Sequence, residues 1–261
     1  MPRQRERFER TDVPRENPYR NIIALVVVVA AIVVAVLICL TLWTRVQHEF
    51  RLGDNNLEDA ISGVSVASNI DGHTASGDTF NKVLVLTTDS LGGAGCTLSG
   101  AYAVVVNETQ GTAIVANIPT AVKVTSSDTS YALADLCAAS GAAAVVQPLF
   151  SATNVSFDHV IVTTSSVDDI LGLVAGASGS TADNFVTDNG SLLDVMDTDM
   201  SADSLITFAG EVKAAGGSGI GRVDAATYAE TTTAGDGSTA ETGYQLVDVV
   251  ALNQAVGLLV S

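Results

Sequence analysis

Basic residues are scarce in this 261-residue chain, which holds 12 Lys and Arg against 29 Asp and Glu. Its formal net charge is −17 at pH 7, and no arginine occurs between Arg51 and Arg222. A surface of this charge repels nucleic acid, anionic lipid headgroups and free polyanions at modest salt. The composition therefore argues against a nucleic-acid partner, although a salty habitat or a need for solubility also selects acidic surfaces.

Cysteine is rare as well, with three in the whole chain. Cys39 falls inside a long apolar run, whereas Cys96 and Cys137 lie beyond it. A bond between these two would close a loop of about 40 residues and contribute about 4 kcal/mol by the chain-entropy estimate. Disulfides persist outside the cell, so we expect a Cys96–Cys137 disulfide, with two unpaired buried thiols as the alternative.

Several catalytic motifs are absent. There is no G-x-S-x-G and no S-x-x-K, so the sequence gives no support for serine-hydrolase or penicillin-binding chemistry. The segment GGSGIG at 216–221 is neither a G-x-G-x-x-G fingerprint nor a P-loop, because no Lys-Ser/Thr follows it. The histidines lack the spacing of metal ligands, and we interpret His159 as a structural residue.

The longest feature present is the apolar run from Ile22 to Trp43, which contains no charge, glycine or proline. At about 1.5 Å per residue it extends about 33 Å, which is enough to cross a hydrocarbon core of about 30 Å. A signal-peptide core or a buried core helix is the alternative. Both are usually shorter, and no A-x-A cleavage site follows the run, so we predict a membrane-spanning helix.

The flanking charges predict the direction of this helix. Residues 1–20 carry six arginines, whereas Arg45 and Arg51 are the only bases close to its other end. Positive charge stays in the cytoplasm, so we predict a single-pass plasma-membrane protein with a cytoplasmic N-terminus. We expect a cytoplasmic basic tail, a signal-anchor helix, a juxtamembrane stalk or linker, and an extracytoplasmic domain, at residues 1–20, 21–44, 45–79 and 80–261.

The pattern of apolar residues beyond position 80 predicts an α/β domain. Short β-branched runs indicate strands, and apolar residues at helical spacing indicate helices between them. Strands are expected at 82–88, 101–107, 112–118 and 157–164. Helices are expected at 130–150 with a break near Gly141, at 167–177 and at 201–215. A weak strand with a long loop and then a strand-to-helix unit complete the chain. This alternation implies a central mixed β-sheet flanked by helices on both faces.

The order of these segments resembles the LytR–CpsA–Psr domain. The segment FNKVLVLTTDS at 80–90 is similar to that family's strand ending in Ser-Asp, and AYAVVVNETQGTAIVANIP at 101–119 is similar to its hairpin leading to Ile-Pro-Arg-Asp. FDHV at 157–160 is similar to the Ile-Asp-His-Tyr strand, and 167–177 to the helix that follows it. The resemblance covers roughly residues 80–216, and order and spacing carry it rather than any single motif.

This resemblance implies a membrane-anchored cell-envelope protein with an α-β-α fold. Members of the family transfer glycopolymers from a polyprenyl-pyrophosphate carrier to peptidoglycan. Their arginines hold the pyrophosphate, because a doubly charged leaving group needs bidentate cations, and their aspartates help to coordinate a divalent metal.

Most charged residues of that site are replaced here. Asp89 matches the aspartate after the first strand and is the one candidate metal ligand by resemblance. Thr97 and Ser99 stand where the family has an Arg-x-Asp pair before the second strand. Thr120 stands at the arginine of Ile-Pro-Arg-Asp. These four positions would form part of a degenerate ligand site.

Aspartates occupy the positions of two further arginines. Asp197 and Asp199 align with the two arginines of the family's Tyr-Val-Arg-x-Arg segment. An arginine about 5 Å from a phosphate charge contributes about 3 kcal/mol at an effective dielectric near 20, and an aspartate turns this into a repulsion of similar size. We therefore predict no pyrophosphate-lipid transfer by the family's mechanism.

The sequence thus favours a pseudoenzyme, a non-catalytic binding or regulatory module in cell-wall glycopolymer assembly. Its partners would be the membrane, a polyprenyl lipid or cell-wall glycan, and active relatives. Two alternatives stay open. One is an active glycopolymer–peptidoglycan phosphotransferase with a rearranged site, which would use Mg²⁺. The other is a structural surface protein that reuses the fold.

Overall fold

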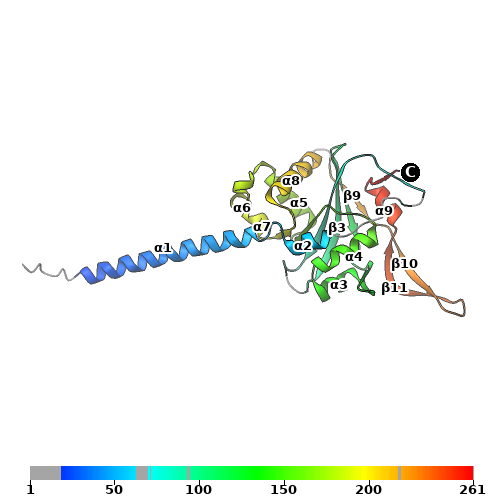
Figure 1. Cartoon of the computed structure of the whole chain (residues 1–261), viewed down its shortest axis with the longest axis horizontal. Coiled ribbons are helices and arrows are strands. Elements are labelled where there is room, and N and C mark those ends of the chain that lie inside the picture. Colours follow the sequence, from blue (N-terminus) through cyan, green and yellow to red (C-terminus); the bar gives the residue numbers. More distant parts are fainter. Residues whose placement is uncertain (1–18, 63–69, 71, 93–94, 217–218, 261) are drawn as a thin grey trace, which may run out of the picture. The chain divides into compact units, whose positions relative to one another are not determined.

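The computed structural model describes residues 19–62, 70, 72–92, 95–216 and 219–260 (Figure 1). The chain divides into two compact units, Met1–Val46 and Gln47–Ser261.

The first unit contains most of helix α1 (Arg20–Glu49). Its segment Leu25–Trp43 has a mean hydropathy of 3.4 and no buried residues, so α1 is long and apolar enough to cross a membrane. An apolar helix satisfies its own backbone hydrogen bonds, which is the condition for stability in lipid. The predicted span at 21–44 coincides with this candidate membrane helix.

The second unit is built on a six-stranded mixed sheet with the order β8-β7-β2-β3-β4-β9. Its strands are β2 (Phe80–Thr88), β3 (Leu98–Asn107), β4 (Thr112–Ile118), β7 (His159–Thr163), β8 (Met196–Thr198) and β9 (Gly221–Asp224). The pairs β2–β7 and β4–β9 are parallel, and the other neighbours are antiparallel. The predicted mixed sheet is confirmed.

The central strand β2 is buried on both faces. Val83 and Val85 contact one hydrophobic core, whereas Leu84 and Leu86 contact the other. A continuous apolar run is what a strand covered on both sides requires, and this explains why its position was predictable. The next two strands form a hairpin whose turn places Gly111 at φ 65°, a conformation that glycine adopts without steric cost.

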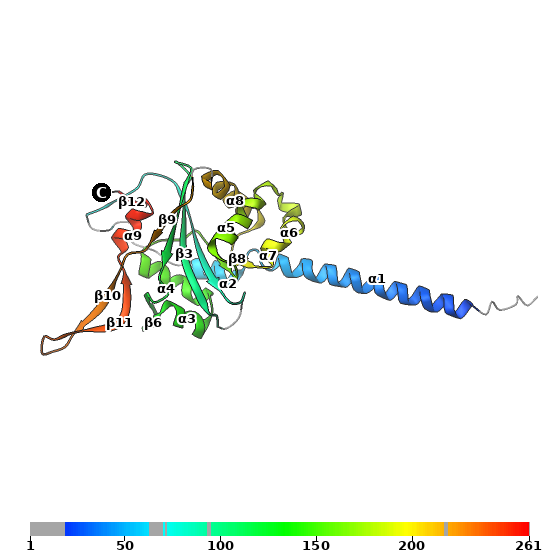
Figure 2. The ribbon, with the colours of Figure 1, turned by 180° about the vertical axis from the view of Figure 1, so that it is seen from behind.

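Helices cover the two faces of the sheet, as Figures 1 and 2 show. Helices α2 (Asn55–Ile61), α3 (Leu133–Ser140) and α4 (Ala143–Thr153) pack on one face. Helices α5 (Val167–Gly176) and α8 (Ala202–Gly216) pack on the other, together with the short helices α6 (Phe185–Asp188) and α7 (Gly190–Leu193). The fold therefore has the α-β-α layers that the sequence predicts.

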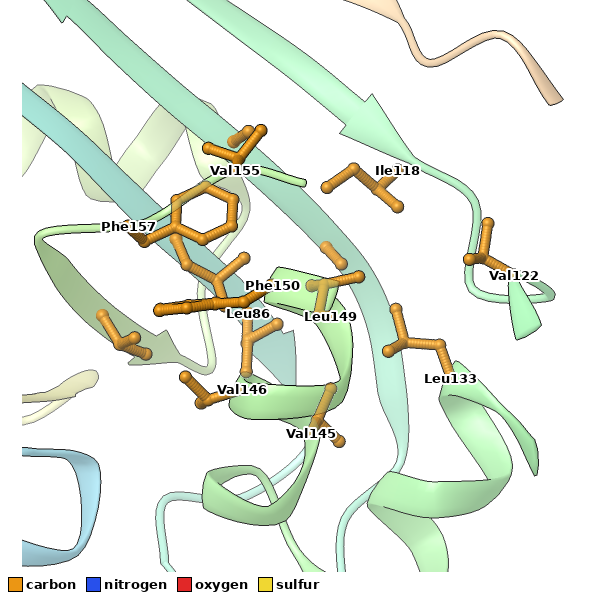
Figure 3. Close-up of a cluster of buried hydrophobic side chains, with 14 of the residues drawn as sticks. Leu86, Ile118, Val122, Leu133, Val145, Val146, Leu149, Phe150, Val155 and Phe157 are labelled. Carbon is orange, nitrogen blue, oxygen red and sulfur yellow. The ribbon is translucent and has the colours of Figure 1, made fainter. Parts of the chain in front are cut away.

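Aromatic and branched side chains fill the core under α4 (Figure 3). The rings of Phe150 and Phe157 lie 5.1 Å apart, and Figure 3 shows them beside Leu86 of β2. On the other face α8 buries Leu205 and Phe208, as its helical spacing indicates. The expected cap of α5 also forms, since Ser166 Oγ accepts a hydrogen bond from Asp169 N at 3.2 Å.

The segment 45–79 differs from the predicted stalk. Asp54 caps α2, whose Leu57 is 3% exposed within the core of the second unit. Strand β1 (Thr74–Ala75) pairs with β12 (Leu259–Val260) near the end of the chain. The compact unit begins at Gln47 rather than at Phe80, because isolated apolar residues in a polar segment find their partners only in the tertiary fold. Residues 63–69 and 71 lie outside the described part.

Two hairpins were also missed. Strands β5 (Lys123–Ser126) and β6 (Thr129–Ala132) turn through Ser127 and Asp128 at φ 48° and 65°, so the helix expected from 130 begins later, at Leu133. Strands β10 (Thr227–Thr233) and β11 (Thr239–Val247) form a long hairpin that projects from the sheet (Figure 2). Helix α9 (Val249–Ala255) follows.

Candidate functional site

A cavity of about 410 Å³ lies between the helices α2 to α4 and the strands β7 and β8. Its wall comes from the start of α2, the loop after β2, the junction of α3 and α4, and the two strands. The residues that line it are Asp54, Asn56, Leu57, Ser90, Gly92, Cys96, Ala142, Ala143, Val162 and Asp197. Parallel strands of α/β folds bring ligands to the edge where their carboxyl ends meet, and the loop after β2 leaves that edge.

Asp197 is the most deeply buried acidic residue on this wall, with 7% of its surface exposed. Its Oδ2 accepts a hydrogen bond from Arg51 Nη1 at 3.2 Å. Its Oδ1 is buried and has no hydrogen-bond partner among the described residues. Leaving a buried acceptor unpaired costs about 1–3 kcal/mol, and more when the group is charged. The carboxylate is therefore short of one donor.

Burial raises the pKa of Asp197 to about 6, and the nearby charge of Asp54 acts in the same direction. The guanidinium of Arg51 opposes this rise without cancelling it. The carboxyl group is thus largely ionised at neutral pH, yet it titrates within reach of mildly acidic conditions. A carboxyl with such a shift on a cavity wall is a candidate functional group.

Arg51 reaches Asp197 from the segment that was predicted to be a linker. Residues 51–54 run beside β8, with Thr198 N bonded to Arg51 O and Asp54 N bonded to Thr198 O, both at 3.0 Å. The two side chains are 146 residues apart in the sequence. Sequence reasoning placed this arginine outside the domain and so missed the pair. The sequence offered one signal for a role of Arg51, because the chain has no other arginine until Arg222.

Asp54 supplies a second carboxylate to the wall. Its Oδ1 accepts a hydrogen bond from Asn56 N at 2.7 Å and so caps α2. Aspartate is a favoured cap residue because it satisfies one of the free N–H groups at the start of a helix. The local charge therefore comprises Asp54 and Asp197 against the single guanidinium of Arg51.

Asp89 and Thr97, two of the predicted site residues, bind each other across the loop after β2. Asp89 Oδ1 accepts from Thr97 N at 2.8 Å, and Asp89 N donates to Thr97 O at 3.2 Å. The hydrogen bonds from Thr97 lower the pKa of the Asp89 carboxyl. Their neighbours Ser90 and Cys96 line the cavity, whereas these two residues close the loop beside it.

Ser99 and Thr120 are bound elsewhere. Ser99 Oγ donates to the Thr87 carbonyl of β2 at 3.0 Å. Thr120 follows β4, and its carbonyl accepts from Ala134 N at 3.0 Å. Neither residue lines the cavity.

Asp199 belongs to a separate pair at the start of β7. Its Oδ2 lies 2.6 Å from His159 Nδ1, and its Oδ1 accepts from Val160 N at 2.7 Å. The hydrogen bond with Asp199 raises the pKa of His159, although burial acts against it. Of the six predicted positions, only Asp197 therefore lines the cavity itself.

The structure joins Cys96 to Cys137 by a disulfide with the two Cα atoms 5.3 Å apart. Cys96 N also donates to Cys137 O at 3.0 Å. The bond fastens the loop after β2 to α3 and holds one wall of the cavity in position. Both cysteines are buried.

Asp89 has no neighbouring set of metal-ligating side chains among the described residues. Its carboxylate is engaged by Thr97 N, and no group of three or more His, Cys, Asp or Glu side chains that could hold a metal occurs within the described ranges. Magnesium requires near-octahedral oxygen ligands, usually including carboxylates. The nearby aspartates Asp194, Asp197 and Asp199 instead contact three different basic side chains.

No protein-family model matches the chain, and no curated protein matches it. Similar solved structures include the Lin1025 protein from Listeria innocua, with 11% identity over 68% of this chain and 95% of that chain, and a TM-score of 0.45. They also include TagV from B. subtilis, with 9% identity over 69% of this chain and 95% of that one, and a TM-score of 0.43.

A structure described as TagT bound to LI-WTA is similar over 75% of this chain and 97% of that one, with 12% identity and a TM-score of 0.44. TagV and TagT are LytR–CpsA–Psr proteins, so the similar structures include members of the family that the sequence resembles. These values describe a similar arrangement of strands and helices.

Proposed function

We propose that this chain is a membrane-anchored protein of the cell envelope whose extracytoplasmic domain binds a ligand of cell-wall glycopolymer assembly without transferring it. The resemblance of segments 80–216 to the LytR–CpsA–Psr domain supports the setting. The apolar helix α1 supports the anchor. The disulfide between Cys96 and Cys137 supports the placement outside the cytoplasm, where such bonds persist.

The charge of the cavity wall is the observation that supports binding without transfer. Two carboxylates, Asp54 and Asp197, line it, and the one guanidinium beside them, Arg51, is already bound to Asp197. Each carboxylate about 5 Å from a phosphate charge opposes binding by about 3 kcal/mol at an effective dielectric near 20. A pyrophosphate headgroup would therefore be repelled. An uncharged lipid or a glycan without phosphate would not be.

Binding of matched lipids to the full chain in detergent micelles tests this proposal. A short polyprenyl pyrophosphate and the polyprenol of equal length would be titrated by calorimetry, with and without Mg²⁺. We expect the pyrophosphate to bind no more tightly than the alcohol in either condition. Tighter, Mg²⁺-dependent binding of the pyrophosphate would overturn the proposal and favour a transferase with a rearranged site.

A further inference from the structure

The cavity wall holds more negative charge than positive charge. Among the described residues, Asp54 and Asp197 are the charged ones that line it, and Arg51 bonds to Asp197 at 3.2 Å. The pair neutralises itself, so one carboxylate charge is left without a balancing cation on this wall. The other polar side chains that line it are Asn56 and Ser90, which are uncharged.

Asp197 is the carboxylate that lacks a donor. It is 7% exposed, and its Oδ1 has no hydrogen-bond partner in the described part of the chain. Asp54, by contrast, uses its Oδ1 to cap α2. Asp197 lines the cavity with the small exposed part of its side chain, whereas Oδ1 itself is buried. A ligand that brings a positive charge to this wall would contact the exposed part of the carboxylate and balance the charge that Asp54 adds.

We propose that the cavity binds an amino sugar through its free ammonium group, which donates to the Asp197 carboxylate. The inference rests on the proposed function, since a glycan of the envelope is the source of such a sugar. An ammonium brings three donors and the missing positive charge in one group. Asn56 and Ser90 offer polar groups to the hydroxyls, and Leu57 and Val162 offer an apolar surface to the C–H face of the ring.

Other ligand classes fit this wall less well. An anion meets two carboxylates. A divalent metal needs several oxygen ligands, and the described residues contain no group of three or more His, Cys, Asp or Glu that could hold one. A neutral hydroxyl donates a hydrogen bond but leaves the charge of the wall unbalanced. An ammonium meets both needs, and hydrogen bonds to charged groups are the stronger ones.

A series of three disaccharides tests the proposal on the full chain in detergent micelles. Chitobiose, N,N′-diacetylchitobiose and cellobiose share one linkage and differ at position 2, which carries an ammonium, an acetamide or a hydroxyl. We expect chitobiose to bind at least about tenfold more tightly than the other two, which is the factor expected for one charged hydrogen bond. Equal affinities, or weaker binding of chitobiose, would overturn the proposal.

Substitutions around the carboxylate sharpen the test. Asp197→Asn keeps the size of the side chain and removes its charge, so the preference for chitobiose should fall by about tenfold. If Asp197→Asn loses its fold by circular dichroism, Asp54→Asn replaces it. That variant removes a charge from the wall and keeps the helix cap, so it should weaken binding.

Glu241→Gln is the matched control for general attraction of a cation to an acidic protein. Glu241 is exposed on the β10–β11 hairpin and does not line the cavity. We expect this variant to bind chitobiose like the unchanged chain. A loss equal to that of Asp197→Asn would mean that net charge attracts the amine, and the inference would be wrong.

The outcomes also separate this inference from the proposed function. Equal binding of all three sugars defeats the ammonium site but leaves a glycan-binding module. Failure of every sugar to bind defeats the inference, while the polyprenol titration still decides the proposed function. Tight, Mg²⁺-dependent binding of the polyprenyl pyrophosphate defeats the proposed function, whatever the sugars do.

Discussion

Asp197 and Asp199 lie two residues apart, yet their carboxylates are in opposite situations. Their side chains are similarly buried, at 9% and 7% exposed. Asp199 has both oxygens occupied, by Val160 N and by His159 Nδ1. Asp197 has one oxygen on Arg51 and one without a partner in the described residues.

This difference separates a structural carboxylate from a candidate ligand carboxylate better than burial does. Burial alone would assign the two residues the same role. The completed set of hydrogen bonds around Asp199 ties β8 to the start of β7. Asp197, whose set is incomplete, lines a cavity, and its unpaired oxygen is buried behind the cavity wall. Substitutions at these two aspartates and at the disulfide test this contrast.

Removal of the disulfide should affect the cavity side of the molecule more than the other side. We expect the double substitution Cys96→Ala and Cys137→Ala to lower the free energy of unfolding by about 4 kcal/mol. Cys96 lines the cavity and His159 does not, so the pKa of His159 should stay unchanged. Urea unfolding of the full chain in detergent and an NMR titration measure the two quantities. A loss below about 1 kcal/mol, or a shift of His159, contradicts this prediction.

Asp199→Asn should be the more destabilising of the two aspartate substitutions. Loss of the charged partner weakens the contact with His159 and should lower the free energy of unfolding by about 3 kcal/mol at pH 6. The same urea experiment measures it, with Glu241→Gln expected within about 0.5 kcal/mol of the unchanged chain. If Asp199→Asn and Asp197→Asn lowered the free energy of unfolding equally, the two carboxylates would not differ in their contribution to stability.

Asp197→Asn should instead stabilise the chain at neutral pH. The folded-state pKa of about 6 lies above the ordinary value of 3.8, so ionisation of Asp197 opposes folding. Its contribution to stability is therefore lost as the pH rises from about 4 through 6. We expect the variant to gain about 2 kcal/mol over the unchanged chain at pH 7.5 and little at pH 4. If the difference in unfolding free energy between the variant and the unchanged chain did not depend on pH between these limits, ionisation of Asp197 would not destabilise the fold.

The smallest effect concerns His159. The hydrogen bond with Asp199 raises its pKa, so the stability from this pair is fully present below the ordinary histidine value. It is lost as the pH rises through the raised folded-state value. NMR titration of the ring should give a pKa above 6.5, and Asp199→Asn should lower it. If Asp199→Asn left the pKa of His159 unchanged, the pair would not contribute to the pH dependence of stability.

Much of the fold could be predicted because its signals are local. The apolar run of β2 and the hairpin of β3 and β4 need only the pattern of side chains and a turn. The cap at Ser166 needs only residues within one turn of helix. Helix α2 and the β5–β6 hairpin gave no such signal, since their few apolar residues are meaningful only against α4 and its neighbours.

The candidate site was predictable only in its charge. By resemblance, Thr97, Thr120, Asp197 and Asp199 stand at positions where the family has arginines. The loss of the family's activity that this implies stays a prediction. Which of these residues share a cavity did not follow from it. The alignment grouped six positions, and the structure brings only Asp197 to the wall, with Asp54 as a neighbour that no motif indicated.

The apolar helix, the acidic composition, the cysteine pair and the order of strands and helices could be predicted from the sequence, because each depends on composition or on neighbours along the chain. Only the tertiary structure decided that Arg51 meets Asp197, across 146 residues, and that one oxygen of this carboxylate is left without a donor. Contacts of that kind depend on how separate elements pack, and packing depends on the whole core rather than on any local pattern.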